Sequence, residues 1–126
     1  MSILLDTHVL LWWLEDNPAL TAQARETISD PENTVIVSAV SLWEIWLKQS
    51  LGKLRLPDDF MERLAAESFE SLPLVASQTR QVSLLPWRHR DPFDRMLIAQ
   101  AQVEKLILLT AGEALAGYGD CVRLAR

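Results

Sequence analysis

The chain has 126 residues, of which 49% are hydrophobic and 23% charged, values typical of a folded domain with one hydrophobic core. Its hydrophobic runs are too short to cross a bilayer, and Asp6 and His8 interrupt the first of them, which argues against both a membrane protein and a signal peptide. Cys121 is the single cysteine, so an internal disulfide bond is excluded and no zinc signature exists. We predict one cytoplasmic domain over residues 1–126.

The net charge of −5 argues against a broad positive surface for nucleic acids. The acidic excess lies at the N-terminal end, since residues 1–35 hold six acidic and one basic residue, whereas residues 36–126 hold eleven of each. Four arginines lie near Asp91 and Asp94 in the sequence: Arg80, Arg88, Arg90 and Arg95. They predict either a basic rim around two carboxylates or an ordinary solvated surface.

The first half of the chain predicts two strand-to-helix units. An apolar strand at residues 2–5 precedes a hydrophobic helix at 9–14, and a second helix follows at 21–29. After a turn, β-branched residues predict a strand at 34–37. An amphipathic helix at 38–51 completes the second unit.

The second half continues the alternation of strands and helices. In chain order we predict a helix at 57–69, a short strand at 72–75, helices at 77–84 and 91–104, a strand at 106–109, a helical turn at 112–117 and an edge strand at 121–124. Strands that alternate with helices indicate an α/β fold whose parallel sheet is covered on both faces.

Four acidic residues fall where such a sheet binds ligands, beyond the carboxyl ends of its strands. Asp6 ends the first strand, Glu44 lies on the helix after the second, and Asp91 and Asp94 open the helix before a later strand. Clustered carboxylates repel one another unless a cation lies between them, and Mg²⁺ or Mn²⁺ prefers oxygen ligands. The pattern therefore predicts a metal site suited to cutting phosphodiesters.

Each acid also has a structural interpretation. Asp94, three residues after Asp91, is placed to complete the cap of its helix, and Ser41 with Glu44 matches a capping box. Asp6 is able to cap the first helix. Apart from capping, few structural roles would explain an acidic residue directly after a buried strand.

Three segments together resemble the PIN-domain family, in particular its VapC-type toxins. They are LLDTH at residues 4–8, SAVSLWE at 38–44 and RDPFDRMLIAQA at 90–101, and in this order they span nearly the whole chain. The resemblance implies one PIN-like domain with a four- to five-stranded parallel sheet between helices, and Mg²⁺-dependent (or Mn²⁺-dependent) endonucleolytic cleavage of RNA.

The resemblance also implies which residues form the site and which molecules bind the protein. Asp6, Glu44 and Asp94 match the family's first, second and third acids as metal ligands and catalytic residues, and Asp91 matches a flanking acid that belongs to the catalytic residues but not to the metal ligands. The implied partners are an RNA substrate, a cognate VapB-like antitoxin and a second copy of the chain in a homodimer. Four tryptophans are more than a small core needs, and some are expected to face a partner: Trp12, Trp13, Trp43 and Trp46.

One position departs from the family pattern. Where the family usually has Thr-x-Asp after the last long strand, this chain has Thr110, Ala111 and Gly112, so the fourth acid is missing. Two hypotheses follow: an endoribonuclease toxin with weakened metal binding, or a catalytically silent PIN-fold module that still binds its antitoxin. A phosphatase with an aspartyl nucleophile fits less well, because it needs an acid where His8 stands.

Overall fold

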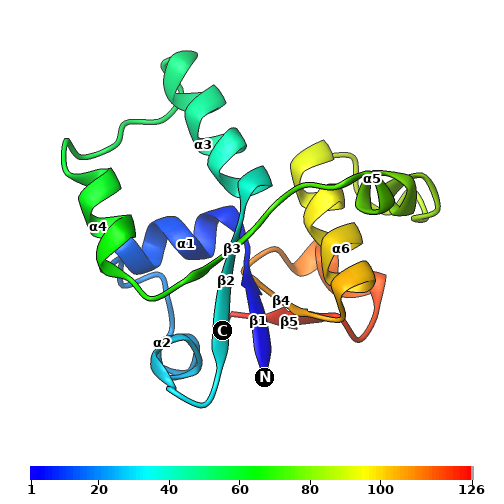
Figure 1. The fold of residues 1–126 in the computed structure, drawn as a ribbon, viewed down its shortest axis with the longest axis horizontal. Helices are drawn as coiled ribbons and strands as arrows, with labels where there is room; N and C mark the ends of the chain where they lie inside the picture. The colour runs from blue at the N-terminus through cyan, green and yellow to red at the C-terminus, as the bar shows by residue number, and fades with distance from the viewer. Residues whose placement is uncertain (126) are drawn as a thin grey trace.

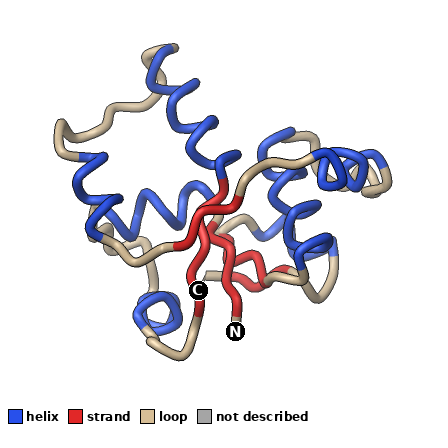
Figure 2. Tube along the Cα trace, in the orientation of Figure 1, coloured by secondary structure: helices blue, strands red, loops and turns tan. Residues whose placement is uncertain are grey.

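The computed structural model describes residues 1–125 and shows a five-stranded parallel sheet between two groups of helices (Figures 1 and 2). The strands are Ser2–Leu5 (β1), Thr34–Ser38 (β2), Glu70–Leu72 (β3), Ile107–Thr110 (β4) and Val122–Leu124 (β5). They lie in the order β3-β2-β1-β4-β5, and every neighbouring pair is parallel. The predicted α/β class with a parallel sheet is confirmed.

Helices pack on both faces of the sheet, as predicted. Their bounds are Thr7–Leu14 (α1), Ala22–Ser29 (α2), Ala39–Ser50 (α3), Phe60–Ala66 (α4), Ala76–Ser83 (α5), Pro92–Glu104 (α6) and the 3-10 helix Glu113–Tyr118 (η1). Helices α1, α2 and α4 cover one face, whereas α5 and α6 cover the other (Figure 1). Across residues 1–125, every helix is too short or too polar to span a membrane.

The residues of β1 divide between two hydrophobic cores. Successive side chains of a strand point to opposite faces of the sheet. Ile3 and Leu5 therefore pack beside α1, whereas Leu4 packs beside α6, and all three are fully buried. A strand covered on both faces needs a continuous apolar run, which explains why β1 shows no alternation of polar and apolar residues.

β3 starts two residues earlier and ends three residues earlier than predicted. It spans Glu70–Leu72 instead of 72–75, and Leu72 pairs with Ser38 at the end of β2. The strand ends there because Pro73 has no backbone N–H to donate to the neighbouring strand. Val75 instead leads into α5 and is exposed.

α4 is shorter than the predicted helix at 57–69. Its first residue is Phe60, whose N–H donates to the carbonyl of Pro57 and closes a separate turn before the helix. The helix ends at Ala66, and Glu67 then accepts a hydrogen bond from the indole Nε1 of Trp13 at 2.9 Å. This tertiary contact ties α4 to α1, which a pattern of neighbouring residues does not reveal.

The strand order reverses on either side of β1, because the chain moves from β1 to β2 on one side and later adds β4 on the other. At such a switch point the connections leave in opposite directions and open a crevice at the carboxyl ends of the strands. Asp6 follows β1 and Thr110 ends β4 at this point, and the N–H of Asp6 donates to the carbonyl of Leu109 at 3.0 Å. The fold thus brings the two segments together.

Candidate functional site

Asp6 is held rigidly at the start of α1. Its side chain accepts a hydrogen bond from the backbone N–H of His8 at 2.9 Å, which caps the helix. The hydroxyl of Thr110 donates to its other carboxylate oxygen at 2.5 Å. Only 5% of Asp6 is exposed. The residue is therefore a helix cap, as the structural interpretation proposed, and it also places a buried charge at the switch point.

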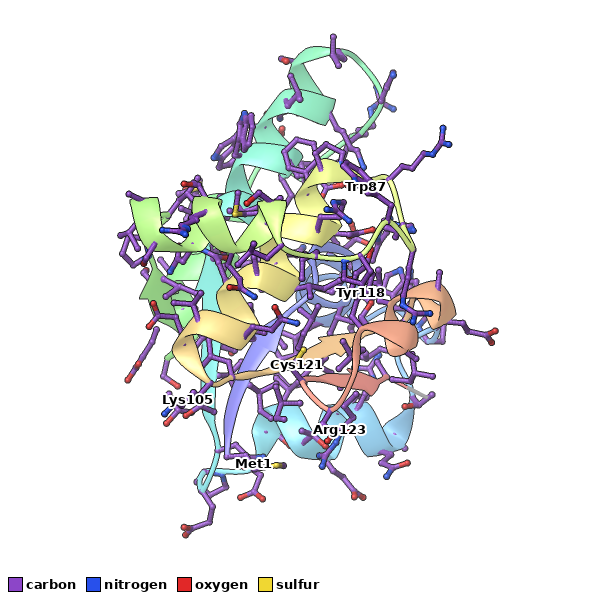
Figure 3. The ribbon with its side chains drawn as sticks, turned by 90° about the vertical axis from the view of Figure 1, so that its right-hand side faces the viewer. Met1, Trp87, Lys105, Tyr118, Cys121 and Arg123 are labelled. Atoms are coloured by element: carbon purple, nitrogen blue, oxygen red, sulfur yellow. The ribbon has the colours of Figure 1, made fainter. Side chains whose placement is uncertain are left out.

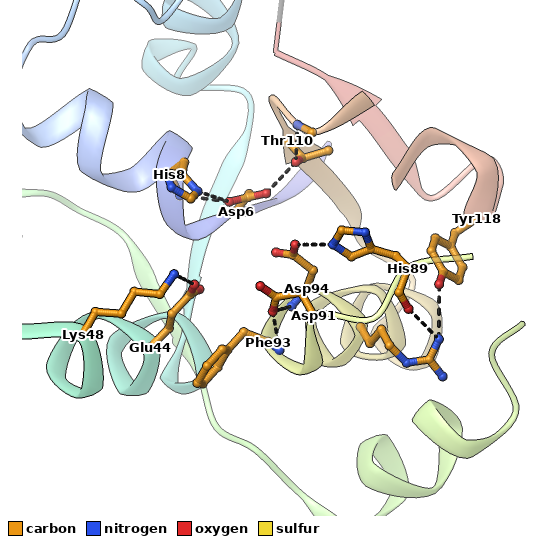
Figure 4. A network of polar contacts seen from close by, with 12 residues as sticks. Asp6, His8, Glu44, Lys48, His89, Asp91, Phe93, Asp94, Thr110 and Tyr118 are labelled. Carbon is orange, nitrogen blue, oxygen red and sulfur yellow. Dashed lines mark hydrogen bonds and ion pairs between the residues drawn. The ribbon is translucent and has the colours of Figure 1, made fainter. Parts of the chain in front are cut away.

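Asp91, not Asp94, caps α6. Its carboxylate accepts hydrogen bonds from the N–H groups of Phe93 at 2.8 Å and Asp94 at 3.1 Å, and Pro92 occupies the first helical position. The interpretation of Asp94 as a cap is therefore wrong. Its side chain is free to point across the crevice, where it accepts a hydrogen bond from His89 Nε2 at 2.9 Å (Figure 4).

The pKa of Asp94 shows that the acids affect one another. Burial, followed by the negative charges of Asp6, Asp91 and Glu44, raises this pKa from 3.8 to about 6, although the hydrogen bond from His89 opposes the rise. A carboxyl group that resists ionisation among other carboxylates is a group that a divalent cation would stabilise in its charged form.

Glu44 is almost fully buried on α3, with 2% exposed. One of its oxygens is 2.5 Å from Lys48 Nζ, and the other has no hydrogen-bond partner within residues 1–125. The predicted capping box is absent from this helix, because Ser38 caps α3 and the Ser41 hydroxyl is buried without a partner. The structural interpretation of Glu44 is therefore wrong.

Asp6 and Asp94 line one cavity of about 320 Å³, together with His89 and Gly112. Glu44 lines an adjoining cavity of about 250 Å³, and Figure 4 shows it facing the same crevice from α3. In residues 1–125 no three acidic, histidine or cysteine side chains lie close enough to hold a metal ion as they stand. The donor set nevertheless fits a hard cation, since it consists of carboxylates and includes one buried oxygen without a partner.

Arg95 is not part of a basic rim. It is 3% exposed, and its guanidinium lies 3.9 Å from the centre of the Trp87 ring, the face-on contact of a cation with an aromatic ring. The guanidinium also donates to Tyr118 Oη at 3.2 Å and to four backbone carbonyls, those of Val82, Leu85, Pro86 and His89. Arg95 thus anchors the loop between α5 and α6, from which His89 reaches Asp94.

Replacing Arg95 with methionine is expected to lower the free energy of unfolding by about 3 kcal/mol, because Arg95 is buried and its four carbonyl acceptors, which are buried or partly buried, lose a charged donor. Urea denaturation measures this change. Exposed Arg90, changed to methionine, is the control and is expected to stay within about 0.5 kcal/mol of the parent protein. Equal stability of the two variants would contradict an anchoring role for Arg95.

The raised pKa of Asp94 predicts a pH dependence of stability in EDTA. Between about pH 4 and pH 6 the folded state keeps a proton on Asp94 that the unfolded state has lost, so stability falls as pH rises. The contribution of Asp94 to this fall is at most about 3 kcal/mol, because solvent screens its partly exposed carboxylate. Asp94→Asn should remove it, as thermal unfolding at several pH values measures. Parallel pH profiles for the variant and the parent protein would be the contrary result.

Comparison with known sequences decides the family. The sequence model of the PIN domain matches residues 3–120. The chain belongs to the PIN-domain family. No curated protein is a significant sequence match. The predicted resemblance is confirmed at the level of the family, and the matched residues include the four acids of this PIN domain.

Solved structures share the fold of this PIN domain. A chain of VapBC2 from Rickettsia felis, bound to a DNA fragment from their promoter, has a TM-score of 0.73 at 17% identity, with 98% of this chain and 97% of that chain covered. VapBC-1 from nontypeable Haemophilus influenzae gives 0.69 at 15% identity, with 98% and 96% covered. A toxin-antitoxin complex from Klebsiella pneumoniae gives 0.66 at 21% identity, with 96% and 95% covered.

Sequence reasoning missed two side chains of the site, His89 and Lys48. A signal existed for Lys48, because it lies four residues after Glu44 on the same helix and such pairs meet on one face. His89 lies in a loop, where no periodicity relates it to Asp94. The isolated thiol of Cys121 plays no part in the site, and burial raises its pKa.

Proposed function

We propose that this PIN domain is a metal-dependent endoribonuclease and the toxin component of a VapBC-type pair. The main observation behind this proposal is the group of carboxylates at the switch point: the buried Asp6 and the partly buried Asp94 share a cavity, and the buried Glu44 has an oxygen without a partner in residues 1–125. PIN domains are generally nucleases, and the structures similar to this chain come from toxin-antitoxin complexes.

Asp6, Glu44 and Asp94 would hold the ion, Mg²⁺ or Mn²⁺, through carboxylate oxygens. When bound, such an ion lowers the pKa of water and stabilises the charge that develops when a phosphodiester is cut. His89 keeps Asp94 directed into the crevice through their 2.9 Å hydrogen bond. Asp91 is the flanking acid, and its charge adds to the negative potential at Asp94 while its oxygen caps α6.

The test is cleavage of labelled single-stranded and structured RNAs with Mg²⁺, with Mn²⁺ and with EDTA. We expect products of internal cleavage with either metal and none with EDTA. Equal cleavage with and without EDTA would contradict a metal-dependent reaction. If the protein bound Mn²⁺ in calorimetry but cleaved none of the RNAs, the ribonuclease proposal would be contradicted and the metal site would not.

The second candidate is a PIN-fold module that binds an antitoxin but does not cleave RNA. Gly112 favours it, because this residue lines the cavity of Asp6 and Asp94 and provides no carboxylate there. The cleavage experiment separates the two candidates. The silent module would bind its antitoxin and leave RNA intact under all metal conditions.

The proposed assembly includes a VapB-like antitoxin and a second copy of the chain, in the cytoplasm. Exposed apolar side chains on α3 support a partner: Trp43 is 57% exposed and Trp46 37%, whereas Trp12 and Trp13 are half-buried. Two of the four tryptophans are thus partly buried, and the other two are exposed on α3. Light scattering of the purified chain, alone and with the antitoxin, tests both interactions.

A further inference from the structure

A second cavity adjoins the acidic one and differs from it in charge. It has a volume of about 250 Å³ and lies between α1 and the C-terminal half of α3 with the turn that follows. Its lining includes Thr7, His8, Leu11, Glu44, Lys48 and Lys53. The cavity shares His8 with the acidic cavity, so the two are neighbours at the carboxyl edge of the sheet.

Basic groups outnumber acidic groups in this second cavity. Glu44 is the one acid in its lining, and Lys48 Nζ already balances that charge at 2.5 Å. Lys53 is exposed, and within residues 1–125 its ammonium group forms no ion pair. A chain with a net charge of −5 thus keeps an unpaired cation in the same cavity as the buried Glu44.

Thr7 adds an unsatisfied polar group to the same cavity. The residue is 4% exposed, and its hydroxyl has no hydrogen-bond partner within the described part of the chain. Buried hydroxyl groups without a partner are rare and costly, which is a reason to look for a ligand. Leu11 supplies an apolar wall beside these polar groups.

We propose that this cavity binds a backbone phosphate of an RNA strand, next to the phosphodiester that the acidic cavity receives. Lys53 supplies the free positive charge, and Lys48 lies between the phosphate and Glu44. The inference rests on the proposed function for its choice of ligand. It explains how a protein with net negative charge holds a polyanion beside an acidic site, since one local cation contact offsets the repulsion there.

The experiment compares Lys53→Gln with Lys105→Gln, which removes the same charge at a distant place. Lys105 follows α6 and precedes β4, at the edge where the strands start, on the side of Met1 in Figure 3. Binding of a fluorescent decauridylate in EDTA is measured by anisotropy between 50 and 200 mM salt, roughly the range over which phosphate contacts change affinity. EDTA prevents cleavage, so binding is observed alone.

For Lys53→Gln we expect the slope of log K against log salt to become less steep by about 0.7, the value for one phosphate contact in a single strand. At 0.1 M salt this corresponds to a loss of about fivefold in affinity. Lys105→Gln should keep the parent slope. Circular dichroism checks that both variants fold.

Equal salt slopes for the two lysine variants would overturn the phosphate site, whether both slopes are less steep than that of the parent protein or both equal it. A second control uses a fluorescent decaglutamate. If its binding depended on Lys53 while the binding of decauridylate did not, the cavity would be assigned to an acidic protein segment, and the phosphate site would be overturned. If the protein cleaved RNA with Mg²⁺ but Lys53→Gln bound RNA as the parent protein does, the phosphate site would be rejected and the ribonuclease proposal would be retained. Lys53-dependent RNA binding without cleavage would support the phosphate site and reject the ribonuclease.

Discussion

Asp6→Asn is expected to lower Mg²⁺-dependent RNA cleavage by about 1000-fold or more. Metal ions contribute several kcal/mol to phosphodiester cleavage, and each 1.36 kcal/mol is about a tenfold change in rate. The fold should survive, because asparagine caps helices as well as aspartate does. Its amide oxygen can accept from the N–H of His8, and its amide nitrogen can donate to the Thr110 hydroxyl.

The measurement is the initial cleavage rate at saturating Mg²⁺, together with Mn²⁺ affinity by calorimetry. Asp16→Asn serves as the matched control, because its carboxylate is 90% exposed and pairs with Arg25 at the surface. The control should keep the parent rate and affinity. An Asp6→Asn protein that is folded and as active as the control would remove Asp6 from the catalytic site.

Gly112→Asp is expected to raise the affinity for Mg²⁺ or Mn²⁺ by about 10- to 100-fold, the size of effect typical of supporting ligands. Space for the side chain exists, since a Cβ at this position would meet Thr110 Oγ1 at 3.4 Å and Leu115 Cγ at 3.6 Å, both ordinary contacts. The backbone φ of −79° suits any residue. The new carboxylate would enter the cavity of Asp6 and Asp94, and RNA cleavage should increase.

Gly112→Asn has nearly the same shape without the charge and is the control for this substitution. Calorimetric titration with Mn²⁺ and cleavage rates at limiting Mg²⁺ compare the three proteins. If aspartate and asparagine at position 112 gave the same affinity as glycine, a four-acid design of this site would be wrong. If only the aspartate variant had a higher affinity for Mn²⁺, position 112 would be shown to lie where a fourth carboxylate can bind the ion.

Local sequence was sufficient for the elements whose signals lie within a few residues. The apolar run of β1 and the Asp91-Pro92 start of α6 are examples, because strand burial and helix capping depend on neighbouring residues. Prediction was poorest between residues 57 and 75. There α4 ends where Glu67 meets Trp13, a contact between residues 54 positions apart.

Local sequence patterns also did not predict how the charged side chains are oriented. Arg95 was expected either at a basic rim or on an ordinary solvated surface, and it is instead buried against carbonyls of α5 and of the loop that follows it. Lys53 was given no role, although the fold places it in one cavity with Glu44. Burial decides whether a charge faces solvent or protein, and burial depends on how the helices pack.

The sequence by itself determined the alternation of strands and helices, because this rests on residue types at short, regular spacing. It also indicated the family, through three motifs spread along the chain, and from these motifs it predicted the four acids of the site. Tertiary structure decided which acids are caps and which face the crevice. It also placed Lys48 against Glu44, His89 against Asp94 and Thr110 against Asp6. The reason is physical: charged and polar side chains interact over a few ångströms, and the side-by-side pairing of β1 with β4 brings segments that are distant in the sequence that close together.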